Sequence, residues 1–281
     1  MVTVNFTKMQ GLGNDFVILD YEEYEKSKLE MPALAQKLCD RHFGIGADGL
    51  IIINQNTKNT DIGWYFYNSD GSVAQMCGNG IRCFAKYVKQ KGYVNKDEFS
   101  VETKAGIIIP KINADGLVTV NMNNPVLTPS LIPVNSINNL NIELRAGNQT
   151  FNANAISMGN PHCVIFVEKD SKTYALKYGA EIETNPIFPE KTNVEFIEIL
   201  SRNEISLNVW ERGCGITLAC GTGACASVVA GILNNILDKK VKVNLPGGAL
   251  FIEWNGSTND TDKNVYMTGP AEFSFTGQFD I

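Results

Sequence analysis

The chain has 281 residues, of which 44% are hydrophobic and 19% charged, so it is long enough for two globular domains. Its net charge of −6 argues against nucleic acid as the main partner, because binding to phosphates needs a basic surface. No apolar run has the length of a membrane span, and the first residues lack the pattern of a signal peptide. The sequence therefore predicts a cytoplasmic protein with no membrane partner.

Seven cysteines are an odd number for a disulfide framework, which favours reduced thiols. Two close pairs have spacings that match no common zinc motif, Cys77 with Cys83 and Cys220 with Cys225. Only two histidines could complete such a site. We therefore expect no bound metal.

Runs of β-branched and aromatic residues bounded by Gly, Asn and Asp predict the strands of the first half. They are Phe16–Leu19, Leu50–Ile53, Trp64–Tyr67 and Val101–Ile109. Between them, Pro32–Arg41 is predicted to be a helix, with Pro in its first turn and Leu34 and Leu38 on one face.

A second helix is predicted over Gly80–Lys91, where apolar residues recur at helical spacing and Gly92 can end the helix. It follows directly on Cys77-Gly78-Asn79-Gly80. The pattern therefore places a thiol beside the first amide groups of a helix.

The second half has the same kind of element. The segment Asn135–Thr150 is predicted to be a loop or hairpin, and Cys163–Val167 a strand. The segment Gly223–Asp238 is apolar on nearly every face and follows Cys220-Gly221-Thr222-Gly223. A helix that is apolar all round is a buried one.

The two cysteine elements belong to a longer internal repeat. The distance from Ile62 to Cys77 equals that from Ile205 to Cys220, and the two cysteines are 143 residues apart. Three further matches keep the same order at similar offsets: Gly13-Asn14 with Gly159-Asn160, Val101–Ile112 with Val243–Trp254, and Val120–Pro125 with Val265–Pro270. The chain therefore consists of two related halves.

A cysteine at the start of a helix lies at the positive end of the helix dipole, which stabilises a thiolate and an anionic ligand. Two such elements facing one carboxylate substrate would give it a thiol on either side, which suits removal and return of a proton on opposite faces of one carbon. The remaining cysteines are expected only to pack: Cys39, Cys83, Cys163, Cys214 and Cys225.

Five motifs in one order resemble the diaminopimelate epimerase family. They are Met9–Phe16, Cys77–Cys83, Gly159–His162, Glu211–Gly213 and Ala219–Ala226. The resemblance implies an isomerase that uses no cofactor and interconverts LL- and meso-diaminopimelate in the biosynthesis of lysine and peptidoglycan.

By this resemblance Cys77 and Cys220 are the two catalytic acid/base residues, and His162 and Glu211 tune the thiols. The substrate-binding residues that it implies are Asn14, Asn68, Gly78, Asn79, Asn160, Asn193, Glu211, Arg212, Gly221 and Thr222. Arg can bind a carboxylate through two hydrogen bonds, and Asn can bind both an amine and a carboxylate.

The fold class implied is α/β of the α+β type, with two pseudo-symmetric domains and an active site in the cleft between them. Each domain would wrap strands around a central helix. Residues 1–122 would form the N-terminal half, completed by residues 268–281, and residues 123–267 the C-terminal half. The resemblance also implies a homodimer.

Two alternatives remain open at this stage. The first is a related cofactor-independent racemase or epimerase for proline or hydroxyproline, in which Arg212 would have no evident partner on a substrate with one carboxylate. The second is a non-catalytic or redox protein in which Cys77 and Cys220 form a switchable disulfide.

Overall fold

The computed structural model describes residues 2–74 and 76–281. It divides into two compact units. Unit 1 comprises Met1–Val120 and Gly269–Ile281, and unit 2 comprises Asn121–Thr268.

Unit 1 is built on a mixed sheet of seven strands in the order β18-β1-β2-β3-β4-β5-β6. Its strands are β1 (Thr3–Gly11), β2 (Asn14–Leu19), β3 (Gly49–Asn54), β4 (Ile62–Asn68), β5 (Val101–Thr103), β6 (Gly106–Ile108) and β18 (Glu272–Asp280). A hairpin of β7 (Pro110–Ile112) and β8 (Val118–Asn121) follows β6. The helices are α1 (Tyr21–Ser27), α2 (Met31–Cys39) and α3 (Gly78–Gln90).

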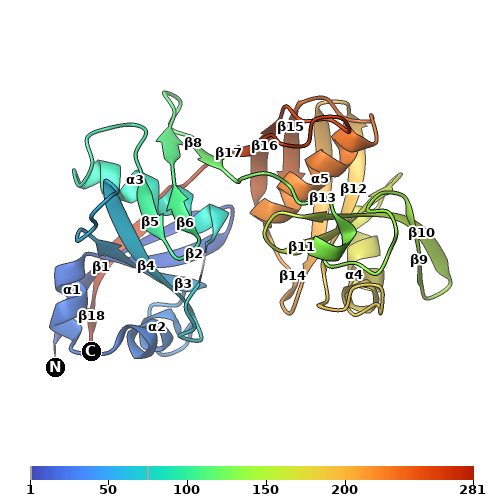
Figure 1. The fold of residues 1–281 in the computed structure, drawn as a ribbon. Helices are drawn as coiled ribbons and strands as arrows, with labels where there is room; N and C mark the ends of the chain where they lie inside the picture. The colour runs from blue at the N-terminus through green and yellow to red at the C-terminus, as the bar shows by residue number, and fades with distance from the viewer. Residues whose placement is uncertain (1, 75) are drawn as a thin grey trace. The chain divides into compact units, whose positions relative to one another are not determined.

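The helices of unit 1 cover opposite faces of this sheet. Leu34 and Leu38 of α2 are fully buried in one apolar cluster with Leu50 of β3, as their helical spacing predicts. Helix α3 packs against β1, β2 and β7 (Figure 1). It approaches the ring of Phe16, whose neighbour Val17 points into the α2 cluster. Successive strand residues point to opposite faces, so α2 and α3 lie on different sides.

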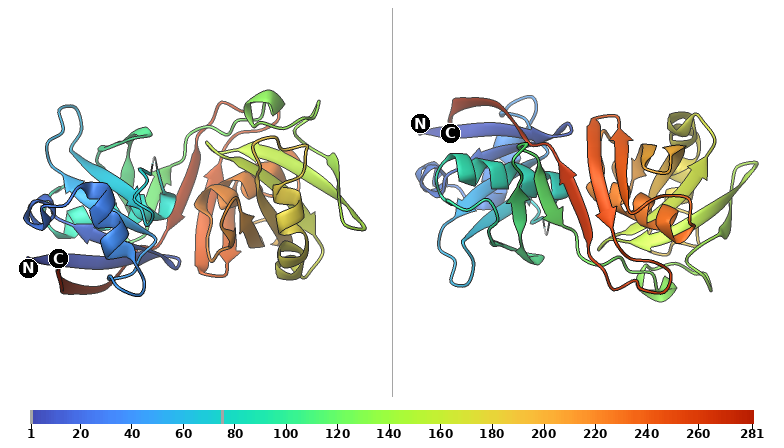
Figure 2. Two further views of the ribbon diagram at one scale, coloured as in Figure 1. Left: turned by 90° about the horizontal axis from the view of Figure 1, so that it is seen from below. Right: turned by 90° about the horizontal axis from the view of Figure 1, so that it is seen from above.

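The two ends of the chain lie side by side (Figure 2). Strand β18 pairs antiparallel with β1, from Thr3 opposite Asp280 to Gln10 opposite Glu272. The last strand of the chain therefore completes the sheet in which the first strand lies.

Unit 2 contains a sheet in the order β17-β16-β15-β13-β12-β11-β10-β9, with β14 beside β13. The strands are β9 (Ile142–Ala146), β10 (Gln149–Ser157), β11 (Pro161–Val167), β12 (Asn193–Ser201), β13 (Glu204–Glu211), β14 (Gly215–Ile216), β15 (Lys240–Leu245), β16 (Gly248–Trp254) and β17 (Val265–Gly269). Its helices are the 3₁₀ turn η1 (Pro129–Leu131), α4 (Ser171–Glu183) and α5 (Gly221–Leu233).

Helix α5 is the buried helix that the sequence predicts. All but three of its residues are buried, and it packs against β10, β11, β12 and β16. The apolar run predicts a helix that ends at Asp238, but the helix ends at Leu233. Asn235 adopts a positive φ of 59°, which ends the helix, and Leu237 folds back over Gly231.

The internal repeat is visible in the topology of both units. In unit 1 the strand pairs from β1 to β6 alternate antiparallel, parallel, antiparallel, parallel, antiparallel. The pairs β10–β11, β11–β12, β12–β13, β13–β15 and β15–β16 of unit 2 follow the same alternation. In each unit the cysteine-bearing helix follows the fourth of these strands. The mixed α/β class and the duplicated halves are thus confirmed.

Several predicted boundaries differ from the structure. Val101–Ile109 is not one strand but the hairpin β5–β6, because Gly106 has a φ of +106° and reverses the chain. The predicted helices Pro32–Arg41 and Gly80–Lys91 begin and end one or two residues earlier, as α2 and α3. In Asn135–Thr150 the hairpin is made by β9 and the start of β10.

Within the described residues, no helix is both long and apolar enough to cross a membrane.

We predict that Gly179→Ala destabilises unit 2. A Cβ at Gly179 of α4 would lie 2.5 Å from the Cβ of Trp210, whose indole N–H donates to Glu183 at 2.7 Å. Displacing the indole should lower the free energy of unfolding by about 1–3 kcal/mol, measured by urea denaturation. Leu176→Ala on the same helix is the control, since Leu176 is 58% exposed. Equal stability of the wild type and Gly179→Ala would show that this contact is not tight.

Candidate active site

Cys77 caps the N-terminus of α3 with its sulfur. Its backbone is extended, with φ −140° and ψ 120°, and its Sγ accepts a hydrogen bond from the Gly80 N–H at 3.4 Å. This is the geometry in which Ser or Asp closes the first turn of a helix. The helix dipole therefore favours negative charge on this sulfur.

Cys220 caps α5 in the same way. Its φ is −122° and its ψ 107°, and its Sγ accepts from the Gly223 N–H at 3.3 Å. The Thr222 hydroxyl lies 3.5 Å from the same sulfur. The two cysteines thus occupy equivalent positions in the two units.

The amide side chain of Asn14 contacts the Cys77 thiol. Asn14 begins β2, directly after the tight turn between β1 and β2. Its Oδ1 accepts from Cys77 Sγ at 3.4 Å and from Asn79 Nδ2 at 3.1 Å. Three residues named from the sequence are therefore in contact in unit 1.

A buried arginine holds the first turn of α3. The Arg82 guanidinium donates to the carbonyl of Gly78 at 3.0 Å and to Asn79 Oδ1 at 2.9 Å. It also donates to the carbonyl of Pro270 at 3.0 Å, which ties the turn to the segment before β18. Arg82 has no exposed surface, so its positive charge lies inside unit 1 near the helix N-terminus.

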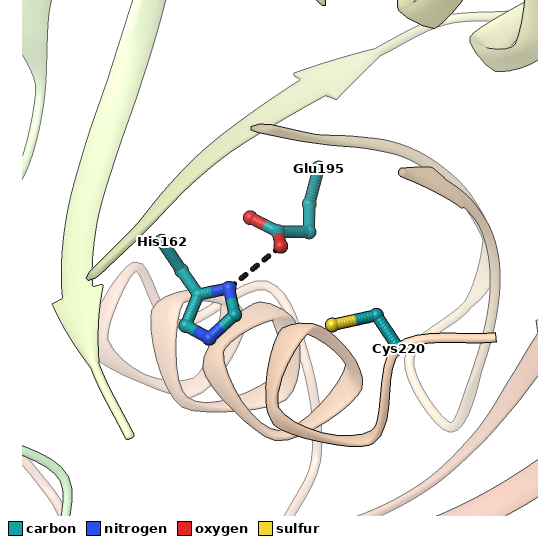
Figure 3. Close-up of side chains that lie close together, drawn as sticks. All are labelled: His162, Glu195 and Cys220. Atoms are coloured by element: carbon teal, nitrogen blue, oxygen red, sulfur yellow. Dashed lines mark hydrogen bonds and ion pairs between the residues drawn. The ribbon is translucent and has the colours of Figure 1, made fainter. Parts of the chain in front are cut away.

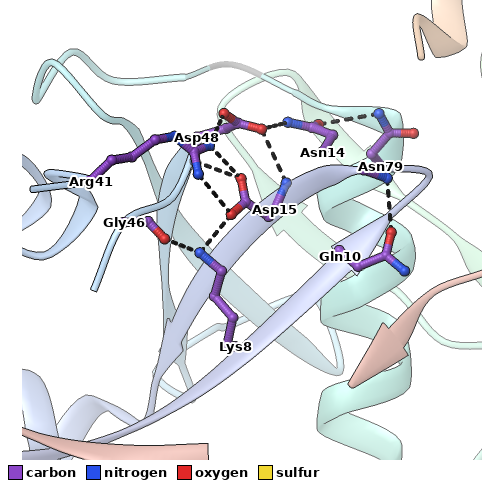
Figure 4. Close-up of polar contacts among 9 residues, drawn as sticks. Lys8, Gln10, Asn14, Asp15, Arg41, Gly46, Asp48 and Asn79 are labelled. Atoms are coloured by element: carbon purple, nitrogen blue, oxygen red, sulfur yellow. Dashed lines mark hydrogen bonds and ion pairs between the residues drawn. The ribbon is translucent and has the colours of Figure 1, made fainter. Parts of the chain in front are cut away.

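A charged network fixes the orientation of Asn14 (Figure 4). Asn14 donates through Nδ2 to Asp48 at 2.6 Å, which turns its Oδ1 toward Cys77. Arg41 bridges Asp48 and Asp15 at 2.7 and 2.8 Å. The sequence reasoning did not identify these charged residues.

The carboxylate of Asp15 is stabilised in its charged form. Burial alone would raise its pKa, but hydrogen bonds from Arg41 and Lys8 outweigh burial and lower the pKa from 3.8 to about 2. Lys8 lies 2.6 Å from Asp15 and also contacts the carbonyl of Gly46.

The Cys220 thiol lies beside a buried contact between an imidazole and a carboxylate (Figure 3). His162 on β11 and Glu195 on β12 have no exposed surface, and Nδ1 of the imidazole lies 2.7 Å from Glu195 Oε1. One side-chain atom from each of these residues and Sγ of Cys220 lie within 4.8 Å of one another. His162 was named from the sequence, whereas Glu195 was not.

Burial, followed by the negative charges of Glu211 and Glu195, raises the pKa of Cys220 well above its ordinary value. Hydrogen bonds from Thr222 and from the Gly223 N–H act in the opposite direction. Burial also raises the pKa of the Glu211 carboxyl, which accepts a hydrogen bond from Thr217. The effects that raise the pKa of Cys220 prevail, so Cys220 is a thiol near neutral pH.

The other predicted residues of unit 2 are arranged in two groups. Asn160 Oδ1 lies 3.0 Å from Nε2 of His162. Asn193 donates to the Pro161 carbonyl at 2.8 Å and accepts from the backbone N–H of Arg212 at 2.9 Å. Asn193 thus holds the end of β13, where the exposed Arg212 donates to a carbonyl at 3.0 Å.

Two further predicted substrate contacts, Gly221 and Asn68, lie at the ends of their elements. Gly221 begins α5, and a Cβ there would lie 3.0 Å from the sulfur of Met267. In unit 1, Asn68 ends β4 and donates to Ser72 at 2.9 Å across a tight turn.

The group His162, Glu195 and Cys220 has the compactness of a metal site. However, Nδ1 of His162 already contacts Glu195.

Packing explains four of the five remaining cysteines, which are buried. Burial raises the pKa of Cys39 and of Cys83 to about 12, and that of Cys163 well above its ordinary value. The expectation was wrong for Cys214, which is exposed in the turn after β13.

Comparison with known proteins identifies the family. A family model described as diaminopimelate epimerase matches residues 6–128 and 154–274. The chain belongs to the diaminopimelate epimerase family. Curated relatives with this name include one from Halothermothrix orenii, 50% identical over 99% of this chain and 98% of its own length. Another, from Trichodesmium erythraeum, is 47% identical over 98% of this chain and 99% of its own.

Solved structures with low sequence identity share the fold of this diaminopimelate epimerase family member. A phenazine biosynthesis protein of the PhzF family from Bacillus anthracis superposes with a TM-score of 0.72 at 15% identity, over all of both chains. A hydroxyproline epimerase from Agrobacterium vitis gives 0.68 at 11% identity, over 99% of this chain and 93% of its own. These structural similarities establish the fold only. The family is established by the family model and by the relatives with high sequence identity.

We predict that Asp15 contributes stability that is lost in acid. Its pKa is lower in the folded than in the unfolded chain, so its contribution is complete above pH 3.8 and falls as the pH approaches 2. The difference in unfolding free energy between the wild type and Asp15→Asn should therefore shrink over this range, measured by urea unfolding at a series of pH values.

Asp97→Asn is the control, because Asp97 pairs with Lys89 on the surface and is 71% exposed. A difference between the wild type and Asp15→Asn that stays constant from pH 5 to pH 2 would contradict the prediction.

Proposed function

We propose that this chain interconverts LL- and meso-2,6-diaminopimelate by a two-base mechanism at one α-carbon. One thiolate removes the α-proton and becomes a thiol, and the other thiol gives its proton to the opposite face of the resulting carbanion. The observation that carries the proposal is the pair of equivalent caps, in which Cys77 and Cys220 each accept a hydrogen bond from the third amide of a helix.

The helix N-termini suit the charge that develops in this reaction. Deprotonation places negative charge next to the α-carboxylate of the substrate, and backbone amides at a helix N-terminus stabilise such charge. We assign α-carboxylate binding to the backbone of Gly78-Asn79 and of Gly221-Thr222. When the reaction runs from the meso to the LL isomer, the two cysteines exchange roles, because the proton is then removed from the opposite face of the α-carbon.

The polar residues around the two caps differ, and we assign them to the distal amino-acid end of the substrate. These residues are Asn14, Asn68, Asn160, Asn193, Glu211 and Arg212. The exposed guanidinium of Arg212 can bind a carboxylate with two hydrogen bonds. Proline has one carboxylate and would leave Arg212 without a partner.

His162 and Glu211 are assigned to tuning the thiols. His162 lies in the compact group with Cys220. Glu211 raises the pKa of the same cysteine through its negative charge. These groups can adjust how readily Cys220 gives and takes a proton.

We further propose that residues 1–122 with 268–281 and residues 123–267 are the two halves of the epimerase, with bounds one or two residues from those of the two units. On the same family grounds, the protein would act as a homodimer in the cytoplasm. The mechanism uses side chains and backbone of the protein alone and needs no cofactor.

The reaction is tested by incubating the reduced protein with LL-diaminopimelate in deuterated water. We expect the meso isomer to form with deuterium at the inverted α-carbon, since the returned proton comes from a thiol that exchanges with solvent. Cys77→Ala and Cys220→Ala should each reduce inversion at least about a thousandfold, because either change removes one of the two bases. Chiral chromatography and mass spectrometry measure both quantities.

Cys83→Ala is the matched control, as Cys83 is a buried cysteine on α3 outside the cap. Full inversion by either cap variant would contradict the two-base mechanism. Turnover of proline or hydroxyproline in place of diaminopimelate would favour the alternative racemase.

A further inference from the structure

Glu195 is a buried carboxylate that the mechanism above does not use. It has no exposed surface, and its Oε2 has no hydrogen-bond partner among the described residues. Its Oε1 contacts His162. A buried carboxylate with one unsatisfied oxygen is costly, so its presence calls for a physical explanation.

The duplication shows what the fold itself requires at this position. In unit 1, β2 and β3 pair in parallel with Phe16 opposite Gly49, and in unit 2, β11 and β12 pair with His162 opposite Asn193. The equivalent of His162 is thus Phe16.

Two residues farther along, Ile51 in β3 corresponds to Glu195 in β12. The apolar pair of unit 1 therefore stands where unit 2 has an ion pair.

The surroundings of the third residue of each helix differ between the two units. A Cβ built on Gly80 would lie 3.5 Å from the Phe16 ring. A Cβ built on Gly223 would lie 2.6 Å from Glu195 Oε1. The same place beside the first helical turn is filled by a ring in unit 1 and by a carboxylate in unit 2. Apolar residues at these positions suffice for the fold of unit 1, so the fold alone does not require the His162–Glu195 contact of unit 2.

The contacts of the His162 ring define what Glu195 can do. Nδ1 faces Glu195 Oε1 at 2.7 Å, and Nε2 faces Asn160 Oδ1 at 3.0 Å. Both ring nitrogens face oxygen acceptors, and both carry a proton only in the imidazolium form. A carboxylate in contact with the ring favours this charged form.

We propose that Glu195 is a positioning residue of the Cys220 site, which fixes the His162 ring beside the sulfur and balances the charge of the ring when it is protonated. This inference rests on the proposed function, in which Cys220 must become a thiolate in one direction of the reaction. A positive ring near the sulfur stabilises that thiolate. Because Glu195 balances the ring, the buried pair adds no net charge to the interior of unit 2.

The titratable groups around the ring come from several elements. They are Glu195 on β12, Glu211 at the end of β13 and Cys220 at the start of α5. Strand β10 places the apolar Ile156 opposite His162. Glu195 is the one of these groups that contacts Nδ1.

The proposal is tested by following the protonation of the two histidines by nuclear magnetic resonance. The chain has only His42 and His162, and the exposed His42 serves as an internal reference. In Glu195→Gln the shape is kept and the charge is lost. We expect the pH midpoint of His162 to fall by about one unit or more, a tenfold change in its protonation equilibrium, while His42 stays unchanged.

The control is Glu198→Gln on the same strand. Its carboxylate accepts from the N–H and the hydroxyl of Ser171, the first residue of α4, at 2.7 and 2.6 Å. It should leave the His162 midpoint in place. The proposal would be overturned if the His162 midpoint were equal in the wild type and Glu195→Gln. It would also be overturned if this midpoint moved equally in Glu195→Gln and Glu198→Gln.

Kinetics provide the second measurement. Glu195→Gln should lower kcat at neutral pH by about tenfold with little change in KM, and should displace the pH profile of kcat. Glu195→Ile, which introduces the residue of the unit 1 position, should lower kcat further. Unchanged kcat in Glu195→Ile would contradict a positioning role. The resonance titration does not depend on the substrate, so it decides the role of Glu195 even if diaminopimelate is not turned over.

Discussion

A sulfur atom closes the first turn of the central helix in each unit, and much of the surrounding sequence serves this contact. The amide of the third helical residue must reach the sulfur, which leaves little room for a side chain there. A Cβ on Gly223 would lie 3.2 Å from Sγ of Cys220. The same amide that holds the thiol also belongs to the positive end of the helix, which favours negative charge on the sulfur. In unit 1 the buried Arg82 holds the equivalent turn by donating to the carbonyl of Gly78 and to Oδ1 of Asn79.

The two units use the same strand order to present different surroundings to equivalent thiols. Cys77 meets an amide oxygen, whose direction is set by Asp48 and Arg41. Cys220 lies beside the His162–Glu195 pair. Duplication accounts for the equivalent positions of the sulfurs, and later divergence of the neighbouring residues accounts for their chemical difference. A two-base epimerase needs both features, because its two bases act on one carbon while the rest of the substrate is not symmetric.

The sequence was most informative where chemistry demands unusual residues. The Cys-Gly pattern predicted both caps, and the collinear matches predicted the common topology, since a repeat preserves strand order. Boundaries were less predictable: the positive φ of Gly106 and Asn235 ends a strand and a helix inside apolar runs. Glu195 was missed because an acidic residue in a strand, such as Glu195 or Glu198 in Asn193–Ser201, is also compatible with an exposed position. Only strand register shows that it faces α5 and not solvent.

The central claim is that each thiol serves one stereoisomer, and exchange without inversion tests it most directly. Cys77→Ala and Cys220→Ala are each incubated with the LL and the meso isomer in deuterated water, and deuterium at the reacting α-carbon is measured. The remaining thiolate can remove a proton from the face that it serves and return a deuteron there. The account predicts that one variant exchanges only the LL isomer and the other only the meso isomer, and that neither inverts its substrate. Exchange of both isomers by a single variant would contradict it.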